Sequence, residues 1–328
     1  ALYRNKGYLG QAVLPNQDIT EGVVRVVVVE GKVGKIIIDA PKDDPRLAPF
    51  VLNRIETFLQ NKLSQGEVLN FDQYDQSLLI VDDLPGVAVR AALQAGVEPG
   101  STDVVAQVIA TPMMRGVAGL DNQGSLSTGE ERLYAQLSID SPWGRGDQWS
   151  FSGSRTQTST SIRGAYQWPF GEERWIGWNT ELSVTAMQYK VLSSVMERTN
   201  PGFVQRDQGQ SQSVGIHFVR PLLRSQSQNL NLNLGYEQRQ SVDKKQSTEQ
   251  NNTSLVKFKD STIEDLSASL SWNKVDGFVG GGSNNMQLNW NLAEFRLKPG
   301  TFETSDYEDR ESAAGTFQKF HFTFNRLQ

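Results

Sequence analysis

The chain has 328 residues, a formal net charge of -5 and a mean hydropathy of -0.45, which allows one large domain or two ordinary ones. It has no cysteine, so disulfides and thiolate metal sites are excluded. No run of about 18 apolar residues occurs, which excludes a membrane-spanning helix but leaves a β-barrel open, because only alternate residues of a barrel strand face lipid. The near-neutral charge without a basic cluster argues against binding of nucleic acid.

Up to about residue 112 the sequence alternates between strand and helix patterns. β-branched runs predict strands, and apolar residues at helical spacing predict helices with one buried stripe. The predicted elements, in chain order, are strands over 22–31 and 33–39, helices over 44–63 and 71–84, and strands over 87–96 and 102–111. From residue 33 onward, this order predicts a three-stranded sheet with two helices on one face. The strand over 22–31 looks like the last strand of a preceding unit of the same kind.

After residue 112 the helical patterns vanish and alternating segments take over. The clearest is QNLNLNLGYEQ (228–238), in which Leu230, Leu232 and Leu234 alternate with asparagines. Successive side chains of a strand point to opposite faces, so this segment has one apolar face and one amide-lined face. We find ten such segments, and their apolar residues are opposed by polar ones. So uniform a polar face indicates a water-filled interior, and the apolar face then meets lipid.

The connections between these segments alternate in length. SPWGRG, PFGEE, RPLLRSQS and KVDGFVGGGS are short, whereas the connections from Tyr189, Ser241 and Arg296 are long and polar. Short turns at one end and long loops at the other are typical of an outer-membrane barrel. Tryptophans near the strand ends would suit its interfacial girdle, namely Trp143, Trp168, Trp175, Trp178 and Trp290. A soluble up-and-down barrel or a sandwich remains the alternative.

The polar side of the alternating segments supplies the candidate lumen-lining residues. The set that we single out comprises Arg132, Gln136, Arg163, His217, Asn231 and Lys319. His217 and His321 have no carboxylate or second histidine at ligand spacing. We therefore expect no metal site, no catalytic residue and no cofactor.

A small α/β module ahead of such a barrel is more specific than either part alone. Three segments resemble the TpsB family, the outer-membrane transporters of two-partner secretion of the haemolysin-activator and filamentous-haemagglutinin-transporter type. The end of that family's first POTRA domain is similar to residues 7–34, GYLGQAVLPNQDITEGVVRVVVVEGKVG. Its second POTRA domain is similar to residues 83–87, DLPGV. Its first barrel hairpin and the turn after it are similar to residues 120–154, LDNQGSLSTGEERLYAQLSIDSPWGRGDQWSFSGS. The resemblance covers essentially the whole chain.

The resemblance implies an α+β POTRA module followed by an antiparallel transmembrane β-barrel. The implied domains are the C-terminal part of a first POTRA domain (1–31), a second POTRA domain (32–111) and the N-terminal part of the barrel (112–328). Members of the family are expected to have a plug helix, two POTRA domains and sixteen barrel strands, with a VRGY loop in the lumen. About ten strands are present here and VRGY does not occur. We therefore expect the chain to be a fragment of a longer protein.

The implied function is export of a large partner protein, of haemolysin, adhesin or haem-binding type, from the periplasm to the cell surface without enzymatic chemistry. The POTRA module would lie in the periplasm and the barrel in the lipid of the outer membrane. The partner would bind in extended form by adding to a sheet edge. The candidate binding residues are Tyr74, Leu78, Val87, Val89, Ala91 and Leu93. The simpler interpretation is that these side chains hold the helices to the sheet.

Two other classes of function remain open. A barrel insertase of the same superfamily usually carries more POTRA domains, and Gln17 with the segment LPNQDI favours the transporter. A passive porin or a barrel enzyme would leave the α/β module unexplained. No Gly-x-Ser-x-Gly motif or plausible triad supports an outer-membrane hydrolase.

Overall fold

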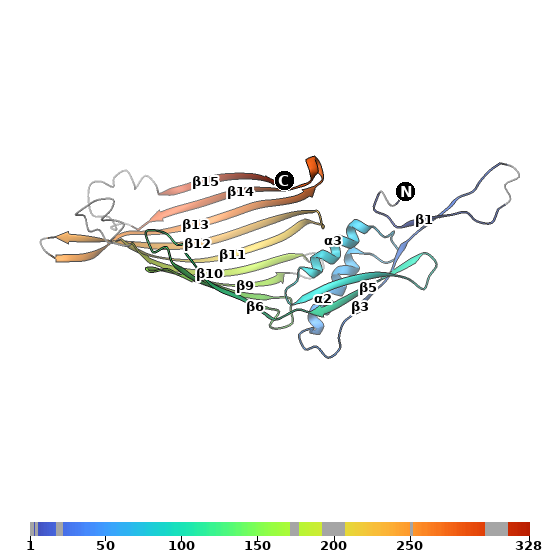
Figure 1. Ribbon diagram of the computed structural model, residues 1–328, viewed down its shortest axis with the longest axis horizontal. Helices are drawn as coiled ribbons and strands as arrows, with labels where there is room; N and C mark the ends of the chain where they lie inside the picture. The colour runs from blue at the N-terminus through green and yellow to red at the C-terminus, as the bar shows by residue number, and fades with distance from the viewer. Residues whose placement is uncertain are drawn as a thin grey trace.

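The computed structural model describes residues 3, 6–17, 22–170, 177–191, 207–249, 252–298 and 314–328. Figure 1 shows three parts in chain order: a short hairpin near the N-terminus, a compact module with two helices, and a long curved sheet. The three sheets have two, three and ten strands. Neither helix described in the structure is long and apolar enough to cross a membrane.

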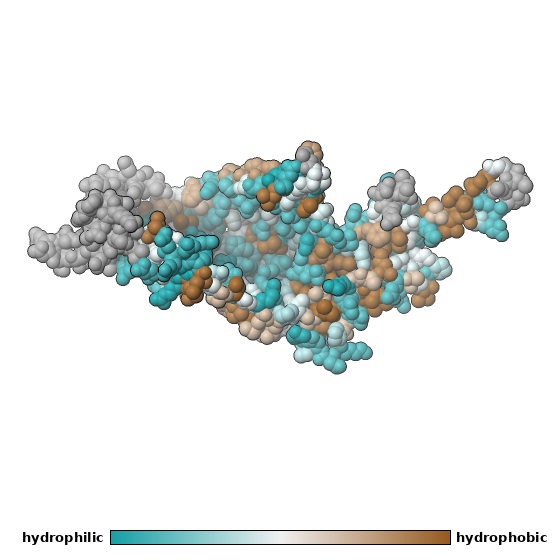
Figure 2. All heavy atoms as spheres, in the orientation of Figure 1, coloured by the Kyte–Doolittle hydropathy of each residue, from teal (hydrophilic) through white to brown (hydrophobic). Residues whose placement is uncertain are grey.

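The N-terminal hairpin pairs β1 (Gly10–Val13) with β2 (Val27–Glu30) in antiparallel register. The side chain of Gln17 fastens it, since its amide nitrogen donates to the Arg25 carbonyl and its amide oxygen accepts from the Arg25 N–H, at 2.8 and 2.7 Å. Val27, Val28 and Val29 are all exposed, and Figure 2 shows this arm as a hydrophobic strip that extends away from the rest of the chain.

The second part is an α/β module formed by residues 32–110. Its sheet has the order β3-β5-β4, in which β3 is parallel to β5 and β4 is antiparallel to it. The predicted order strand, helix, helix, strand, strand is therefore the observed one. Its elements are β3 (Lys32–Asp39), α2 (Pro49–Lys62), α3 (Phe71–Asp82), β4 (Val87–Ala95) and β5 (Ser101–Ala110).

Local chemistry sets the ends of both helices. The prediction that the first helix starts near residue 44 is wrong, because the Asp44 carboxylate accepts hydrogen bonds from the backbone and side chain of Arg46, and α2 begins only at Pro49. Proline suits this first helical position, where its missing N–H has no partner to lose. At α3 the Asn70 side chain accepts hydrogen bonds from the N–H groups of the first turn.

One apolar core holds the helices to the sheet. Val51, Ile55, Phe58 and Leu59 of α2 are at most 2% exposed, at the spacing of a single helix face. They pack with a second set, from α3 and the sheet, that comprises Val81, Val87, Val89, Ala106 and Val108. The other face of the sheet has no helix on it in the described residues, and Ile37 and Ile109 are exposed there.

The third part is a sheet of ten antiparallel strands in sequence order, each paired with its chain neighbours. All ten predicted segments are present as strands, although Ile176 and Trp175, which we assigned to one of them and to the girdle, lie outside the described residues. Among the described residues, β6 and β15 have a paired neighbour on one side only. The strands are β6 (Met114–Asp121), β7 (Arg132–Asp140), β8 (Gln148–Arg155), β9 (Ser159–Phe170), β10 (Trp178–Lys190), β11 (Gln208–Arg224), β12 (Gln228–Glu249), β13 (Asn252–Asp276), β14 (Gly282–Leu297) and β15 (Gly315–Leu327).

One predicted loop is wrong. The polar segment from Ser241 extends β12 and β13 instead, and the two strands pair as far as Glu249 opposite Asn252. Backbone hydrogen bonds hold such a hairpin whatever the polarity of its side chains, so polarity alone misled the prediction. At about 3.3 Å per residue, the 22 residues of β12 reach about 70 Å. This far exceeds the apolar band of about 25 Å in an outer-membrane barrel.

Of the four connections predicted to be short turns, those after β7, β11 and β13 lie at the end of the ten-stranded sheet that faces the α/β module (Figure 1), and the one after β9 lies largely outside the described residues. The turn after β13 contains a short 3-10 helix, η2 (Phe278–Gly280). RPLL, predicted as part of a turn, continues β11, and only residues 225–227 separate it from β12. Trp290 lies in the middle of β14, so the prediction that it is near a strand end is wrong, and its place in a girdle stays a prediction.

We predict that Ile55→Ala destabilises the α/β module by about 2–5 kcal/mol, because it leaves a cavity at a fully buried position. Amide hydrogen exchange of α2 and β5 in the intact protein measures this change. Gln60→Ala, at an exposed position of the same helix, serves as the control. Equal protection in both variants would contradict the assigned core.

Candidate functional site

The strand registers join the apolar residues of the ten-stranded sheet into one continuous face. A single row of directly paired residues crosses nine strands and is apolar in all but the last: Ile139, Trp149, Tyr166, Leu182, Ile216, Tyr236, Leu266, Leu292 and Gln318. Many of these side chains are solvent-exposed in the chain alone, and Phe320, at 70%, is among the most exposed. We call this surface the apolar face.

The opposite surface, the polar face, carries all six residues predicted to line the lumen. Three rows of paired residues from β12 to β15 consist of amide, hydroxyl and imidazole groups: Asn229, Asn273, Asn285 and Asn325; Asn231, Ser271, Gln287 and Thr323; and Asn233, Ser269, Asn289 and His321. Hydrogen bonds link several neighbours, among them Asn229 Nδ2 to Asn273 Oδ1 at 3.0 Å. Part of this surface forms a hollow of about 520 Å³. That these residues line a lumen stays a prediction.

Charges on the polar face are mostly balanced by near neighbours. Arg163 pairs with Glu181 across β9 and β10, and Arg132 pairs with Asp121 across β6 and β7. Among the described residues no group of histidine and carboxylate side chains is arranged to hold a metal ion. His321 contacts Thr323 at 2.9 Å, on the same strand. The polar face therefore offers neutral hydrogen-bonding groups with few isolated charges.

The apolar band runs obliquely across the strands. On β7, the row of paired residues starts with Ile139, at the end of the apolar band near the short turns. On β13, the same row contains Leu266, which lies at the opposite end of the band, about six residues from Trp272 at the short-turn end. Six residues amount to about 20 Å along a strand, and the six steps between strands to about 29 Å across them. The ratio gives a strand tilt of about 35° relative to the band, which lies in the range of transmembrane barrels.

Aromatic rings gather where the apolar face reaches the short turns. Tyr166 contacts Trp149 at 4.7 Å, Trp168 at 5.4 Å and Trp143 at 5.8 Å between ring centroids. The Tyr166 hydroxyl donates to the Asp147 carboxylate at 3.1 Å. Rings with an apolar body and a polar tip suit the border between hydrocarbon and water.

The α/β module is fastened to the short-turn end of the sheet by side chains from both parts. Arg224 of β11 donates from Nε and Nη2 to the two carboxylate oxygens of Asp83, at 2.8 and 2.9 Å. Arg54 of α2 donates to the Pro169 carbonyl at 3.1 Å. The guanidinium of Arg145, in the turn before β8, lies 5.9 Å from the ring centre of Phe50. A bidentate pair of this kind fixes orientation as well as distance.

A cleft of about 210 Å³ lies between the module and the sheet. Helices α2 and α3 contribute Phe58 and Ile80, and Leu84 follows α3, whereas the sheet contributes Asn179 and Asn231, among others. Both asparagines belong to the polar face. The helices therefore stand directly at the edge of the polar face, and the Asp83–Arg224 pair lines both this end of the face and the neighbouring hollow.

The predicted binding residues of β4 and α3 point into the core of the module. Val87 and Val89 are 4% and 6% exposed, Tyr74 is 8% exposed, and the remaining three are partly buried against the same core. Burial raises the pKa of Tyr74, and the nearby charge of Asp75 raises it further, so the phenol stays neutral at physiological pH. Their packing supports the simpler interpretation, in which these side chains hold the helices to the sheet.

The backbone of β4 is partly free to pair with another chain, because β4 is one of the two edge strands of the module's sheet. Thr111 donates to the Gly86 carbonyl and Gly96 donates to the Ser101 carbonyl, so the even-numbered residues of β4 bond to β5. The odd-numbered residues direct their N–H and C=O groups outward. The Asp82 carboxylate accepts the outward N–H of Val89 at 2.7 Å. The outward groups of Ala91 and Leu93 have no hydrogen-bond partner among the described residues.

Comparison with known families identifies the chain. A family described as haemolysin secretion/activation protein ShlB/FhaC/HecB matches residues 100–323. The chain belongs to this haemolysin secretion/activation family. The resemblance seen in the sequence is confirmed, and the match covers all ten strands of the large sheet at least in part.

Relatives in this family are outer-membrane and haem-related transporters. The heme/hemopexin transporter protein HuxB of Haemophilus influenzae (strain 86-028NP) is 24% identical over 249 residues, which are 74% of this chain and 41% of HuxB. The outer membrane transporter CdiB of Dickeya dadantii is 28% identical over 196 residues, 57% of this chain and 32% of CdiB. The chain thus spans less than half the length of these relatives.

Two solved structures share the fold. CdiB from Escherichia coli matches with a TM-score of 0.69 at 20% identity, covering 99% of this chain and 56% of CdiB. CdiB from Acinetobacter baumannii matches with a TM-score of 0.56 at 17% identity, covering 90% of this chain and 54% of that one. The ten-stranded antiparallel sheet of this family member is therefore similar to the sheets of these proteins.

Sequence reasoning missed the residues that join the two parts of this secretion-family chain. Arg54, Asp83 and Arg224 are ordinary charged residues in the sequence, and the pair is 141 positions apart. Asp83 lies in the DLPGV segment that carries the family resemblance, which was the one signal available. Its partner could not be found without the strand register.

We predict that Leu270→Arg destabilises the protein in the membrane by about 2–4 kcal/mol, because Leu270 and its cross-strand partner Leu232 lie well inside the apolar band. Ser269→Arg, one residue away on the polar face, should be nearly silent. Urea titration of the protein folded in lipid vesicles measures both. Equal effects of the two substitutions would refute the assignment of the faces.

We predict that Asp83→Asn loosens the module from the sheet without unfolding either part, because one exposed or partly exposed ion pair contributes about 1 kcal/mol or less. Spin labels on α3 and on β11 report this as a broader distance distribution. Asp83→Arg combined with Arg224→Asp should narrow it again. A distribution unchanged in Asp83→Asn would show that the pair does not hold the module.

Proposed function

We propose that this chain is part of an outer-membrane transporter that exports a partner protein by two-partner secretion. The observation that carries this proposal is the unbroken, in-register separation of the apolar and polar faces across ten strands, with the α/β module fastened at the short-turn end of the polar face. Membership of a family of secretion proteins supports the same assignment, as do relatives described as an outer membrane transporter and as a heme/hemopexin transporter.

The proposed arrangement follows from the two faces. The apolar face meets lipid, the sheet forms part of a barrel wall, and the polar face lines its lumen. The α/β module is a POTRA domain in the periplasm, and the long loops and the extended β12–β13 hairpin lie outside the cell. No catalytic step is needed, because the family exports proteins and the proposal requires no chemistry on the substrate.

The partner enters as an extended chain. The edge of β4 offers the outward N–H and C=O groups of Ala91 and Leu93, which suit pairing with an extended segment. The side chains around these groups remain in the core, so recognition at this edge rests on the backbone. The asparagine-rich rows of the polar face then exchange hydrogen bonds with a passing main chain. Neutral groups of this kind bind weakly enough to release what they hold.

We predict that Ala91→Pro lowers the amount of partner at the cell surface at least tenfold. Proline removes one outward N–H of β4 and is tolerated on an edge strand when that N–H does not face the neighbouring strand. The assay uses the complete gene in a host that also produces the partner, and it measures the partner in the medium and on the surface. Insertion of the barrel in the outer membrane is measured in parallel.

Arg90→Ala is the matched control, because it removes an exposed side chain while the inward N–H of residue 90 keeps its bond to β5. Unchanged secretion by Ala91→Pro would exclude capture at this edge. Deletion of residues 33–111 tests the wider proposal. If other outer-membrane proteins then fail to assemble while the partner is still exported, an insertase function replaces the transporter.

A further inference from the structure

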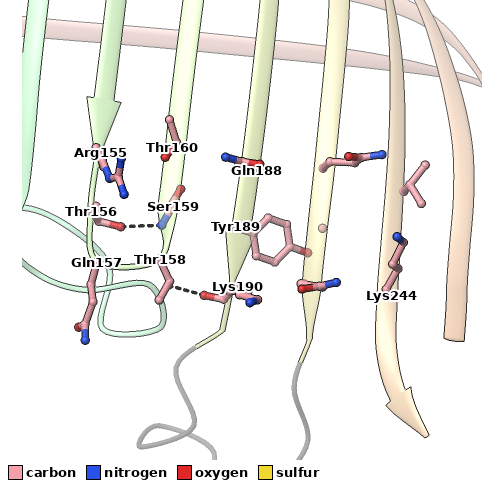
Figure 3. Close-up of a pocket in the computed structure, with 14 residues that line it drawn as sticks. Arg155, Thr156, Gln157, Thr158, Ser159, Thr160, Gln188, Tyr189, Lys190 and Lys244 are labelled. Carbon is pink, nitrogen blue, oxygen red and sulfur yellow. Dashed lines mark hydrogen bonds between the residues drawn. The ribbon is translucent and has the colours of Figure 1, made fainter. Parts of the chain in front are cut away.

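A basic hollow lies on the outer wall, on the loop side of the apolar band. It measures about 420 Å³ and spans β8 to β12. Figure 3 shows Arg155, Lys190 and Lys244 on three different strands around it, with Thr160 and Gln188 between them. The strand registers place all five side chains on the apolar face. Arg155 pairs with Leu133, and Gln188 pairs with Thr160. Gln208 pairs with both Lys190 and Lys244, one on each side of it.

The charge of this hollow is not balanced. None of Arg155, Lys190 and Lys244 forms a salt bridge with any residue that the structure describes. The Asp243 carboxylate, the nearest acidic group in the β12 sequence, accepts the hydroxyl of Tyr189 at 3.0 Å on the polar face. Three cations thus stand together in a chain whose net charge is -5.

On the next two strands, carboxylates balance the positive charges at this level of the wall. On β13 and β14, Arg296 pairs with Glu264 at 2.9 Å and with Glu294 at 2.7 Å, and Lys298 pairs with Asp260 at 3.2 Å. An excess of positive charge is therefore not a general property of this level of the wall. Among the side chains that the structure describes at this level, the excess lies at the hollow on β8 to β12.

An apolar groove adjoins the hollow on the membrane side. It measures about 470 Å³, and its floor is formed by the small residues Ala135, Gly153, Gly164 and Ala186 between the larger side chains of Phe151 and Ile162. Gly153 pairs with Ile162, and two residues further toward the loops Arg155 pairs with Thr160. Groove and hollow are therefore consecutive along the same strands, about 7 Å apart.

We propose that this groove and hollow form one binding site for a phosphorylated lipid of the outer leaflet, with an acyl chain in the groove and a phosphate in the hollow. Arg155, the cation nearest the groove, supplies charge-assisted hydrogen bonds to the phosphate oxygens, and Thr160 and Gln188 supply neutral donors. Lys190 and Lys244, on the second and fourth strands from β8, attract the negative charge over a longer distance. The apolar groove lies on the membrane side and the basic hollow on the loop side, which is the order of acyl chain and phosphorylated headgroup in a lipid. This inference rests on the proposed orientation of the wall, with its long loops outside the cell.

The test uses the complete protein, purified and freed of lipid, with diphosphoryl lipid A as the probe. Arg155→Gln, Lys190→Gln and Lys244→Gln together should weaken binding at least tenfold, measured by retention of lipid in native mass spectrometry. The control is Lys35→Gln, Lys42→Gln and Lys62→Gln together, which removes the same charge from exposed positions of the α/β module. Equal binding by both triple variants overturns the proposal.

A second variant tests the groove. Gly164→Leu should fold, because a Cβ atom there meets the Phe151 ring at an ordinary 3.6 Å and the backbone conformation is not one reserved for glycine. It should weaken lipid A binding at least fivefold and leave binding of inorganic pyrophosphate unchanged. If pyrophosphate binds as tightly as lipid A to the unmodified protein, the hollow is a site for soluble anions and the lipid assignment is wrong.

Membrane insertion separates this proposal from the function on which it rests. If the unmodified chain inserts and exports its partner but lipid A does not distinguish the variants, only the lipid site is wrong. If the chain does not enter the outer membrane, the transporter proposal has failed as well. Stronger binding of phosphatidylglycerol than of lipid A would also overturn the proposal, since the site would then select charge without selecting the outer-leaflet lipid.

Discussion

The structure depends on one constraint, the alternation of side chains along strands that are hydrogen-bonded in register. Backbone hydrogen bonds to the next strand fix the register of each strand, so a shift of one residue would transfer a strand's apolar residues to the wrong face. No such shift separates Ile139 on β7 from Leu292 on β14. The register shift between Pro221 and Leu223, near the short turns, lies outside that row. Two surfaces with opposite solvent preference result.

The α/β module has a different physical basis, since it is held by an apolar core between one face of its helices and one face of its sheet. Polar contacts among the described residues attach it to the sheet, including a bidentate ion pair, a hydrogen bond to a carbonyl and a cation–π contact. Such contacts orient the two parts but contribute little free energy in water. A small polar junction beside a cleft suits a connection that allows relative motion, and relative motion of domains is the usual expectation for junctions of this kind.

Function in this family member is a property of surfaces and edges. The polar face offers rows of amides, the outer wall offers a basic hollow above an apolar groove, and β4 offers two unpaired backbone positions. None of these involves a reactive group. Each provides reversible contacts, and their strength is set by how many neutral donors or unbalanced charges lie together. Contacts of this kind suit the proposed passage of an unfolded chain.

The sequence by itself determined the elements, the two faces of each strand and the family, because all three follow from spacing along the chain. Leu232 and Asn231 reveal their faces through period two, and Ile55 and Phe58 reveal theirs through helical period. It also misplaced the start of α2, where Asp44 binds Arg46, and the ends of β12 and β13, where polar residues continue a ladder. Only the tertiary structure decided which residues meet across strands. Register and strand order determine the Asp83–Arg224 pair, the oblique course of the apolar band and the hollow lined by Arg155, Lys190 and Lys244. Contacts between residues far apart in the chain leave no periodic signal in the sequence.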